Sequence, residues 1–449
     1  MLLHILSSTS VVVLGREIDL AGLGCSVICR FVCGLKLRRC AELCIVLHAA
    51  PVLPPVYAKR LGVGNMSAVL KLVTQKQFSE QVDVDLESSS RNGHSLQTPL
   101  SYLSPWQPAV LRHVTERFSV KGQTVLDLTC AAGATGVECA SQGRHFIGCT
   151  NEYALAKLAR ARLNPADIAE VVLRLQFINF KRPVDIRGFQ EPFSNFFDID
   201  TYRELLSLKL ALRGSQDRVG HFIQFVVASI IHGHTVGHLS AYTSPQAAIT
   251  PGAQATLNGK RGEVPSYRAV GARVIKKAAM LLRDGIPSGL QDDSIERSIY
   301  CAEPNNIIDV GTGKVDLALL CPEQPGAVQQ GLRSWLRSWW LGVDLPEQRP
   351  EIASIPAWQE HISEVLLETA RVVRRGGRAV IRTGNGRLGT KVVNYKEQLA
   401  QVLDACLPTY WQVEGTIIEQ HVKSSGLIKG ASDRPYSSGA GELVVLRRK

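Results

Sequence analysis

The pattern that decides the fold is Val125-Leu126-Asp127-Leu128-Thr129-Cys130-Ala131-Ala132-Gly133-Ala134-Thr135-Gly136. It begins as a short apolar run typical of a strand, passes through small residues that favour a tight turn, and continues as a helix. Only glycine or alanine leaves room in such a turn for a ligand to approach the backbone closely. The stretch therefore predicts a ligand-binding strand–turn–helix corner, and a tightly packed corner without a ligand is the alternative.

The same alternation continues outward from this corner. Residues 143–148 indicate a second strand and residues 153–163 a second helix. After a long polar region with helical periodicity, strand patterns resume at 315–320 and 378–381, and two final runs at 415–418 and 442–446 are typical of an antiparallel pair. Strands that alternate with helices predict an α/β fold: a doubly wound, mostly parallel sheet with an antiparallel edge hairpin and a helical insertion.

Composition narrows the class of protein. The 449-residue chain is 45% hydrophobic and 20% charged, which is typical of a globular protein of two domains and excludes disorder as the default. A formal net charge of +11 favours a polyanionic partner, with nucleic acid ahead of an anionic membrane surface. No run of about 20 uninterrupted apolar residues is present to span a membrane, so no membrane partner is expected.

Cysteine and histidine usage argues against a disulfide framework or a metal centre. The 11 cysteines are not arranged as in short secreted domains, which indicates a reducing, cytoplasmic compartment. His232, His234 and His238 lack a fourth ligand at a useful spacing. One cluster near the amino terminus also matches no common ligand pattern: Cys25, Cys29, Cys33, Cys40 and Cys44. We therefore expect no metal.

The stretch from Asp127 to Gly136 resembles the first motif of DNA amino-methyltransferases, usually Asp-Pro-Phe-x-Gly-Ser-Gly-Thr-Thr. Asp127, Gly133 and Thr135 match this motif, whereas Leu128 replaces its proline and Ala131 its first glycine. The resemblance implies a Rossmann-like class I methyltransferase fold and S-adenosylmethionine as cofactor. The residues that it implies at the cofactor are Asp127, Cys130, Gly133, Thr135, Asn151, Glu152 and Asp309.

The ribose position departs from the family. An acidic residue is expected at the end of the second strand, where this chain has Cys149 and Thr150. Glu152 is the nearest substitute, although its spacing differs, and Asp309 is a candidate for the adenine side of the pocket.

A second stretch, residues 315–326, resembles the strand and the Ser/Asp/Asn-Pro-Pro-Tyr motif of the same family. In that motif the first side chain and a backbone carbonyl hold the target amine, and the aromatic ring stacks on a flipped base. Here Cys321 replaces the polar acceptor, Glu323 the second proline and Gln324 the ring, while Pro322 is kept. The resemblance implies that Cys321, Pro322 and Gln324 form the catalytic loop, and an ordinary proline-rich loop after a buried strand is the alternative.

The inserted region is expected to bind DNA, because related enzymes carry a DNA-reading segment between the two motifs. Basic residues on one helix and just before it are the candidates for phosphate contacts, although any one of them is also compatible with a solvated helix face. They are Lys260, Arg261, Arg268, Arg273, Lys276 and Lys277.

These observations predict five segments. Residues 1–65 form an N-terminal extension, for which a start codon assigned upstream of Met66 is one explanation, and 66–101 form a linker. Residues 102–180 are the first half of the methyltransferase domain with the cofactor loop, 181–300 the helical insertion, and 301–449 the second half.

The predicted function is S-adenosylmethionine-dependent methyl transfer to an exocyclic amine of adenine or cytosine in double-stranded DNA, as in restriction–modification. Two alternatives stay open. One is a catalytically inactive DNA-binding protein or subunit with the same fold, and the other is a methyltransferase for RNA or a small molecule. The sequence does not fix the oligomeric state.

Overall fold

The computed structural model describes residues 4–7, 10–13, 16–19, 77–85, 93–243, 249–325, 334–344, 352–388, 390–422 and 441–449. The chain divides into two compact units, Met1–Gln77 and Phe78–Lys449. In the first unit, β1 (His4–Ser7), β2 (Ser10–Val13) and β3 (Arg16–Asp19) form an antiparallel sheet. The N-terminal cysteine cluster and Met66 lie outside the described residues.

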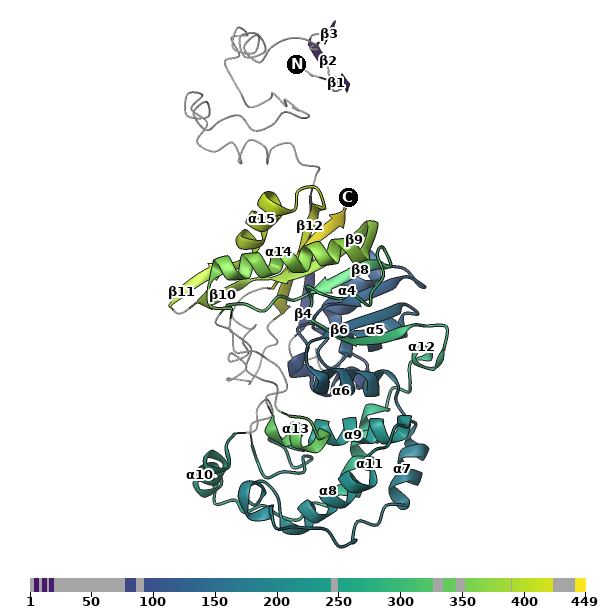
Figure 1. The fold of residues 1–449 in the computed structure, drawn as a ribbon, viewed down its shortest axis with the longest axis vertical. Helices are drawn as coiled ribbons and strands as arrows, with labels where there is room; N and C mark the ends of the chain where they lie inside the picture. Colours follow the sequence, from purple (N-terminus) through teal and green to yellow (C-terminus); the bar gives the residue numbers. More distant parts are fainter. Residues whose placement is uncertain are drawn as a thin grey trace. The chain divides into compact units, whose positions relative to one another are not determined.

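The second unit is built on an eight-stranded sheet (Figure 1). In spatial order its strands are β4 (Phe78–Asp85), β12 (Trp411–Val422), β13 (Glu442–Arg448), β9 (Val373–Thr383), β8 (Val315–Leu320), β5 (Thr124–Asp127), β6 (His145–Thr150) and β7 (Arg297–Cys301). Neighbouring strands from β9 to β7 are parallel, whereas β13 runs antiparallel between β9 and β12. The predicted doubly wound, mostly parallel α/β fold is confirmed.

One segment differs from its prediction. The polar stretch 66–101, expected as a linker, contains β4, which pairs in parallel with β12 and extends the sheet beyond the antiparallel pair. It also contains the short 3-10 helix η4 (Ser95–Gln97), whose residues are buried. The polar residues did not indicate this strand. An edge strand is stabilised by backbone hydrogen bonds to one neighbour and by one buried face, so it does not need a continuous apolar run.

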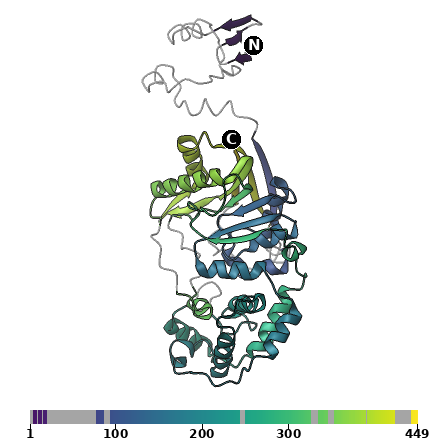
Figure 2. The ribbon, with the colours of Figure 1, turned by 45° about the vertical axis from the view of Figure 1, so that its right-hand side comes forward.

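Helices cover both faces of the sheet (Figures 1 and 2). Strand residues alternate between two cores, as a pleated backbone requires: Val125 and Phe146 belong to one, and Leu126 and Ile147 to the other. The first core also contains buried side chains from α4 (Pro108–Phe118), α5 (Ala134–Ser141) and α6 (Tyr153–Leu163). The second is completed by α14 (Ile355–Val372) and α15 (Tyr395–Cys406).

The insertion between α6 and β7 is helical, as predicted, although it begins earlier than residue 181. Its elements are α7 (Ile168–Gln176), the π-helical turn η6 (Phe189–Phe193), α8 (Ile199–Ala211), α9 (Arg218–Ile230), α10 (Pro251–Arg261), α11 (Val270–Leu281) and α12 (Ser288–Gln291). Buried residues at Val270, Val274, Ala278 and Leu281 place one face of α11 in the first core. The last residues of the predicted range, from Arg297, already belong to the sheet in β7.

A helix from elsewhere in the chain completes the insertion. The short helix α13 (Trp335–Leu341), which follows β8 in sequence, packs its tryptophans into the insertion. Trp335 and Trp339 lie 5.4 and 4.7 Å from the Phe193 ring, and the Trp340 indole donates to the Gln224 carbonyl at 2.9 Å. The insertion and the segment that follows β8 therefore share one core.

The remaining elements are the 3-10 helix η5 (Ser101–Leu103) and a hairpin of β10 (Asn385–Leu388) and β11 (Lys391–Asn394). Within the described ranges, no helix is both long and apolar enough to cross a bilayer.

Candidate active site

The candidate site lies where the direction of strand order reverses. From β5 the chain builds outward to β6 and β7, and then returns to the other side of β5 for β8 and β9. In open α/β sheets, ligands bind outside the carboxyl ends of the strands at such a point. The loops after β5 and β8 therefore meet at one place.

Backbone hydrogen bonds attach the loop after β5 to the two neighbouring strands, β8 and β6. The Leu128 amide donates to the Leu319 carbonyl of β8 at 2.9 Å. On the other side, the Cys130 amide donates to the Cys149 carbonyl of β6 at 3.1 Å. The turn is thus fixed at both flanks before any side chain contributes.

The Asp127 carboxylate organises the inside of this loop. It has no exposed surface, and it accepts hydrogen bonds from the Thr129 amide at 2.9 Å and from the Thr135 hydroxyl at 2.5 Å. Burial raises the pKa of Asp127 to about 6, although the hydrogen bonds from Thr135 and Thr129 act in the opposite direction. Both oxygens are engaged inside the protein, so Asp127 and Thr135 fix the shape of this loop.

Two residues of the turn adopt left-handed backbone conformations. Gly133 has φ +80°, and a Cβ at this position would stand 2.9 Å from the Ala159 Cβ of α6. Ala131 has φ +45°, which is costly for a residue with a side chain. Ala131 stands where the resembling motif has its first glycine, so the structure shows why a glycine suits that position.

The catalytic loop predicted after β8 reaches the turn directly. The buried Cys321 donates its backbone N–H to the Thr129 hydroxyl at 3.2 Å. Thr129 in turn contacts the Asp127 carboxylate, also through its hydroxyl at 3.3 Å. The two sequence motifs, almost two hundred positions apart in the chain, are thus joined by the side chain of Thr129, which is not among the predicted site residues.

Two more contacts hold the rest of this loop. The Trp358 indole of α14 donates to the Glu323 carbonyl at 2.8 Å. The Gln324 side chain lies against the Gly386 backbone of β10, where any Cβ would overlap its amide and the Tyr395 ring. Pro322 and Gln324 are therefore positioned by α14 and the β10–β11 hairpin, which neither motif contains.

Acidic and amide groups meet at the ends of β6 and β7. The Asn151 amide, just after β6, donates to the Glu303 carboxylate, just after β7, at 3.3 Å. Glu152 caps the start of α6 beside them. Glu303 thus supplies a carboxylate next to the position where the sequence lacks one. No signal in the sequence indicates it, because the strand that precedes Glu303, β7, was not predicted.

Asp309 and the cysteines of the predicted cofactor set occupy different surroundings. Asp309 is exposed, and its neighbours Ile307 and Val310 are buried in the core that contains α14. Burial and then the charges of Asp127, Asp309 and Glu368 raise the pKa of Cys149 to about 12. Cys130 is also buried, and its pKa is raised well above the ordinary value, chiefly by burial, which keeps the thiol protonated.

The predicted DNA-contacting residues divide into two groups. Lys260, Arg261 and Lys276 are exposed, and Arg273 and Lys277 are half-buried on α11. Arg268, in contrast, is 9% exposed, and its guanidinium donates to the carbonyls of His238, at 2.8 Å, and Ser240. The assignment of Arg268 to a phosphate contact is corrected, because its donors already brace the protein's own backbone.

The histidines are used internally. His232 is buried against the Ser334 hydroxyl, and His238 Nδ1 lies 2.8 Å from the Thr235 hydroxyl. In the part of the chain that the structure describes, no group of three His, Cys, Asp or Glu side chains is placed to hold a metal ion.

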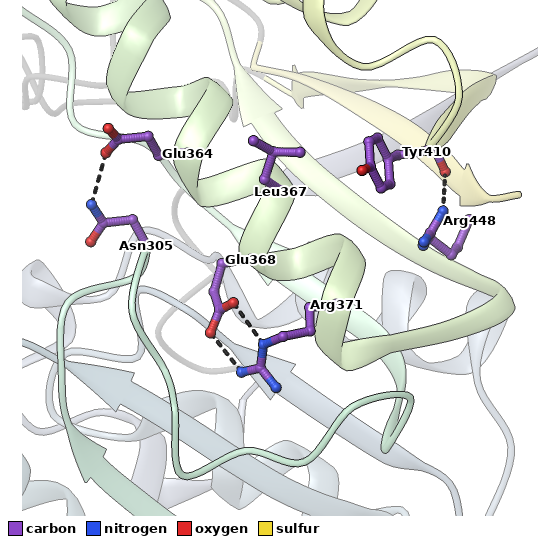
Figure 3. Close-up of a pocket in the computed structure, with 7 residues that line it drawn as sticks. All are labelled: Asn305, Glu364, Leu367, Glu368, Arg371, Tyr410 and Arg448. Atoms are coloured by element: carbon purple, nitrogen blue, oxygen red, sulfur yellow. Dashed lines mark hydrogen bonds and ion pairs between the residues drawn. The ribbon is translucent and has the colours of Figure 1, made fainter.

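A pocket of about 690 Å³ lies elsewhere, along α14 (Figure 3). Its lining residues are Asn305, Glu364, Leu367, Glu368, Arg371, Tyr410 and Arg448. Its charged groups are satisfied by one another or by the backbone: Arg371 pairs with Glu368 at 2.6 Å, and Asn305 donates to Glu364 at 2.9 Å. None of the predicted site residues lines it.

The strand order, with the antiparallel β13 between two parallel strands, defines a class I methyltransferase fold. No protein-family model matches the chain, and no curated protein matches it.

Solved structures of similar architecture include a putative rRNA methylase from Clostridium thermocellum, at 9% identity over 75% of this chain and 95% of that one, with a TM-score of 0.30. A SAM-dependent methyltransferase from Methanosarcina mazei has 8% identity over 74% and 96%, with a TM-score of 0.30. A putative DNA modification methylase from Thermus thermophilus, in complex with S-adenosylmethionine, has 19% identity over 30% and 48%, with a TM-score of 0.19. At such scores the fold assignment depends on the strand order, and the substrate is not defined.

The left-handed turn yields a prediction on stability. Replacing Ala131 with glycine should raise the free energy of unfolding by up to about 1 kcal/mol, because it relieves the φ of +45°. Replacing Gly133 with alanine should lower it by roughly 1–3 kcal/mol, because strain and the contact with Ala159 add. Urea unfolding of both variants measures the difference, and equal effects at both positions would contradict the described turn.

Asp127 yields a prediction on pH dependence. Its pKa is about 6 in the folded protein and 3.8 ordinarily, so the folded state holds this proton more tightly. Its contribution to stability is therefore greatest below pH 3.8, falls as the pH rises, and levels off above about pH 6. Asp127→Asn should remove this decline of roughly 2–3 kcal/mol.

Denaturant unfolding of the native protein and of Asp127→Asn between pH 4 and 7 tests this. Asp293→Asn, at a fully exposed carboxylate, serves as the matched control and should leave the pH profile unchanged. Parallel profiles for the native protein and Asp127→Asn would show that Asp127 titrates as an ordinary carboxyl.

Proposed function

We propose that this protein transfers a methyl group from S-adenosylmethionine to an exocyclic amine of adenine or cytosine in double-stranded DNA. The observation that carries the proposal is the hydrogen bond between Cys321 and Thr129, at 3.2 Å. It brings the loop that resembles a cofactor motif against the loop that resembles an acceptor-amine motif, at the crevice of a methyltransferase fold. The fold alone does not select a substrate, so the DNA assignment depends on the two motifs and the insertion.

The residues at the carboxyl ends of β5, β6 and β7 suit the cofactor. Small residues at 131–133 leave the backbone of the turn open to the methionine moiety, with Cys130 and Gly133 shaping its floor. Asn151, Glu152 and Glu303 offer an amide and two carboxylates for ribose hydroxyls, and Asp309 remains the candidate on the adenine side. When bound there, the cofactor supplies the activated methyl group.

The acceptor side has little covalent chemistry to perform. An exocyclic amine nitrogen would form the new N–C bond as the sulfur–methyl bond breaks, with the demethylated cofactor as leaving group, and would then release a proton to water, so no general base is demanded. The protein's contribution is positioning and hydrogen bonding at Cys321, Pro322 and Gln324. A thiol is a weak acceptor, and an amide replaces the stacking ring, so we expect slow transfer by the natural sequence.

An inactive, DNA-binding protein of this fold is the second candidate. The three replacements in the catalytic loop favour it, because Cys321, Glu323 and Gln324 each depart from the group that the chemistry uses. Methyl transfer to RNA or a small molecule is the third, because nothing in the crevice itself distinguishes those acceptors.

The cofactor assignment is tested by calorimetry. The protein should bind S-adenosylmethionine or its demethylated product, and Glu303→Gln should weaken binding about 10- to 100-fold, because a charged acceptor to the ribose is lost. Glu360→Gln, at an exposed carboxylate of α14, is the control and should bind as the native protein does. Gly133→Val should abolish binding, whereas Gly188→Val, which meets no neighbour within 4 Å, should not. No binding at millimolar ligand would refute the enzyme proposal.

Restoring the family pattern distinguishes an enzyme from an inactive protein. Cys321→Ser, Glu323→Pro and Gln324→Tyr together should raise methyl incorporation into duplex DNA, with the ring alone contributing about 10- to 100-fold from stacking. The double variant without Gln324→Tyr isolates that contribution. Radiolabelled methyl transfer measures the rates. If the triple variant binds cofactor and DNA yet transfers nothing, the inactive candidate is the correct one.

A further inference from the structure

Residues 230–243, at the end of α9 and just after it, form a closed loop with an exposed tip. The Leu239 amide returns to the Ile230 carbonyl at 2.8 Å, and the Thr243 amide returns to the Gly233 carbonyl at 3.1 Å. The tip, residues 234–237, is exposed except for backbone contacts, and 85% of Val236 is accessible to solvent. A large apolar side chain this exposed at the end of a loop is available for a partner.

The loop is rigid at its base. The His238 ring fills its centre, lying over Gly233 so closely that any Cβ at Gly233 would overlap it. Beneath, the buried Arg268 guanidinium donates to the His238 and Ser240 carbonyls. His232, at the start of the loop, contacts Ser334, which begins the helix after the catalytic loop. The base of the loop is therefore held in place by Arg268 and His238, and His232 links it to the start of α13.

Cationic groups from two helices lie close to the tip. Arg273 of α11 donates to the Val236 carbonyl at 3.5 Å, and Lys277 lies one helical turn further along the same helix. Arg261, at the end of α10, places its guanidinium 3.3 Å from the centre of the Tyr242 ring, which meets the His234 ring edge-on at 6.4 Å. The nearby Glu263 is already engaged by the Tyr242 amide at 3.3 Å and by Arg268 at 3.9 Å.

The electrostatics of the loop support an anionic partner. Burial, and then the positive charges of His234, Lys277 and Arg337, lower the pKa of His238 to about 4, although a hydrogen bond with Thr235 acts in the opposite direction. Burial alone lowers the pKa of Lys277. The positive charges of Arg273 and Lys277 beside the tip favour the approach of phosphates.

We infer that this loop is the DNA-reading element of the insertion: the tip at His234, Thr235 and Val236 contacts base edges, while Arg261, Arg273 and Lys277 hold phosphates. The inference depends on the proposed DNA substrate and adds where and how that DNA is read. An exposed tip with cationic side chains beside it suits a groove, because the base edges of duplex DNA are bordered by its phosphate backbones.

The first test measures affinity by fluorescence anisotropy with a labelled duplex. Arg273→Gln with Lys277→Gln should weaken binding to every duplex and lower the slope of log affinity against log salt by roughly 2, because each lost phosphate contact accounts for about 0.9. Arg375→Gln, at an exposed arginine near the start of β9, is the control and should leave the slope unchanged.

The second test measures sequence reading with a pool of randomised duplexes, sequenced after capture by the protein. Val236→Asp should abolish the enrichment seen with the native chain and weaken binding at least tenfold, whereas Val120→Asp, at a valine 61% exposed before β5, should preserve both. Unchanged enrichment with Val236→Asp, or tighter binding of single-stranded RNA of the same sequence than of duplex DNA, would overturn the inference.

Calorimetry with S-adenosylmethionine distinguishes failure of the proposed methyltransferase function from failure of the assignment of this loop as the DNA-reading element. The loop variants should bind cofactor as the native protein does, which also shows that they are folded. If the cofactor binds and transfer to DNA occurs, yet every loop variant reads DNA normally, the reading element lies elsewhere and only the inference on the loop fails.

Discussion

The buried Asp127 carboxylate is the interaction on which the site depends. It holds the Thr129 amide and the Thr135 hydroxyl, and through the Thr129 hydroxyl it reaches the backbone of Cys321. A buried carboxylate is tolerated only when its oxygens are hydrogen-bonded, so the turn around it is fixed by the cost of leaving them unsatisfied. The shape of the cofactor loop and the place of the catalytic loop are thus set by one constraint.

A second level of organisation connects the insertion to this centre. The chain leaves the catalytic loop, enters α13, and there buries its tryptophans among the aromatic rings of the insertion. Ser334 and Arg337 add hydrogen bonds to His232 and to the Ala228 carbonyl at either end of this contact. Segments that are separate in sequence therefore fold as a single body around the site.

The sequence predicts six of the eight strands of the sheet, all but β4 and β7, because strand alternation and tight-turn residues are local signals. It does not predict Glu303, Gly386 or Trp358, whose roles arise only when distant elements meet. The prediction for Arg268 was wrong for the same reason. The sequence shows that the residue is basic, but not that the loop after α9 places the carbonyls of His238 and Ser240 against its guanidinium. Thr129 lies within the first motif but does not match the family at that position. The resemblance therefore did not identify it as the residue that joins the loops after β5 and β8.

The strand β4 has a consequence for the way the chain acquires its structure. Near the start of the second unit it pairs in parallel with β12, close to the end of the chain. Its ladder of hydrogen bonds has no partner until residues 411–422 have been synthesised, and closing so long a loop is slow because many chain conformations must be lost first. During translation, β4 and the neighbouring α4 are made long before the strand with which β4 pairs. Until β12 has been synthesised, the backbone groups of β4 are unpaired and can associate with other nascent chains.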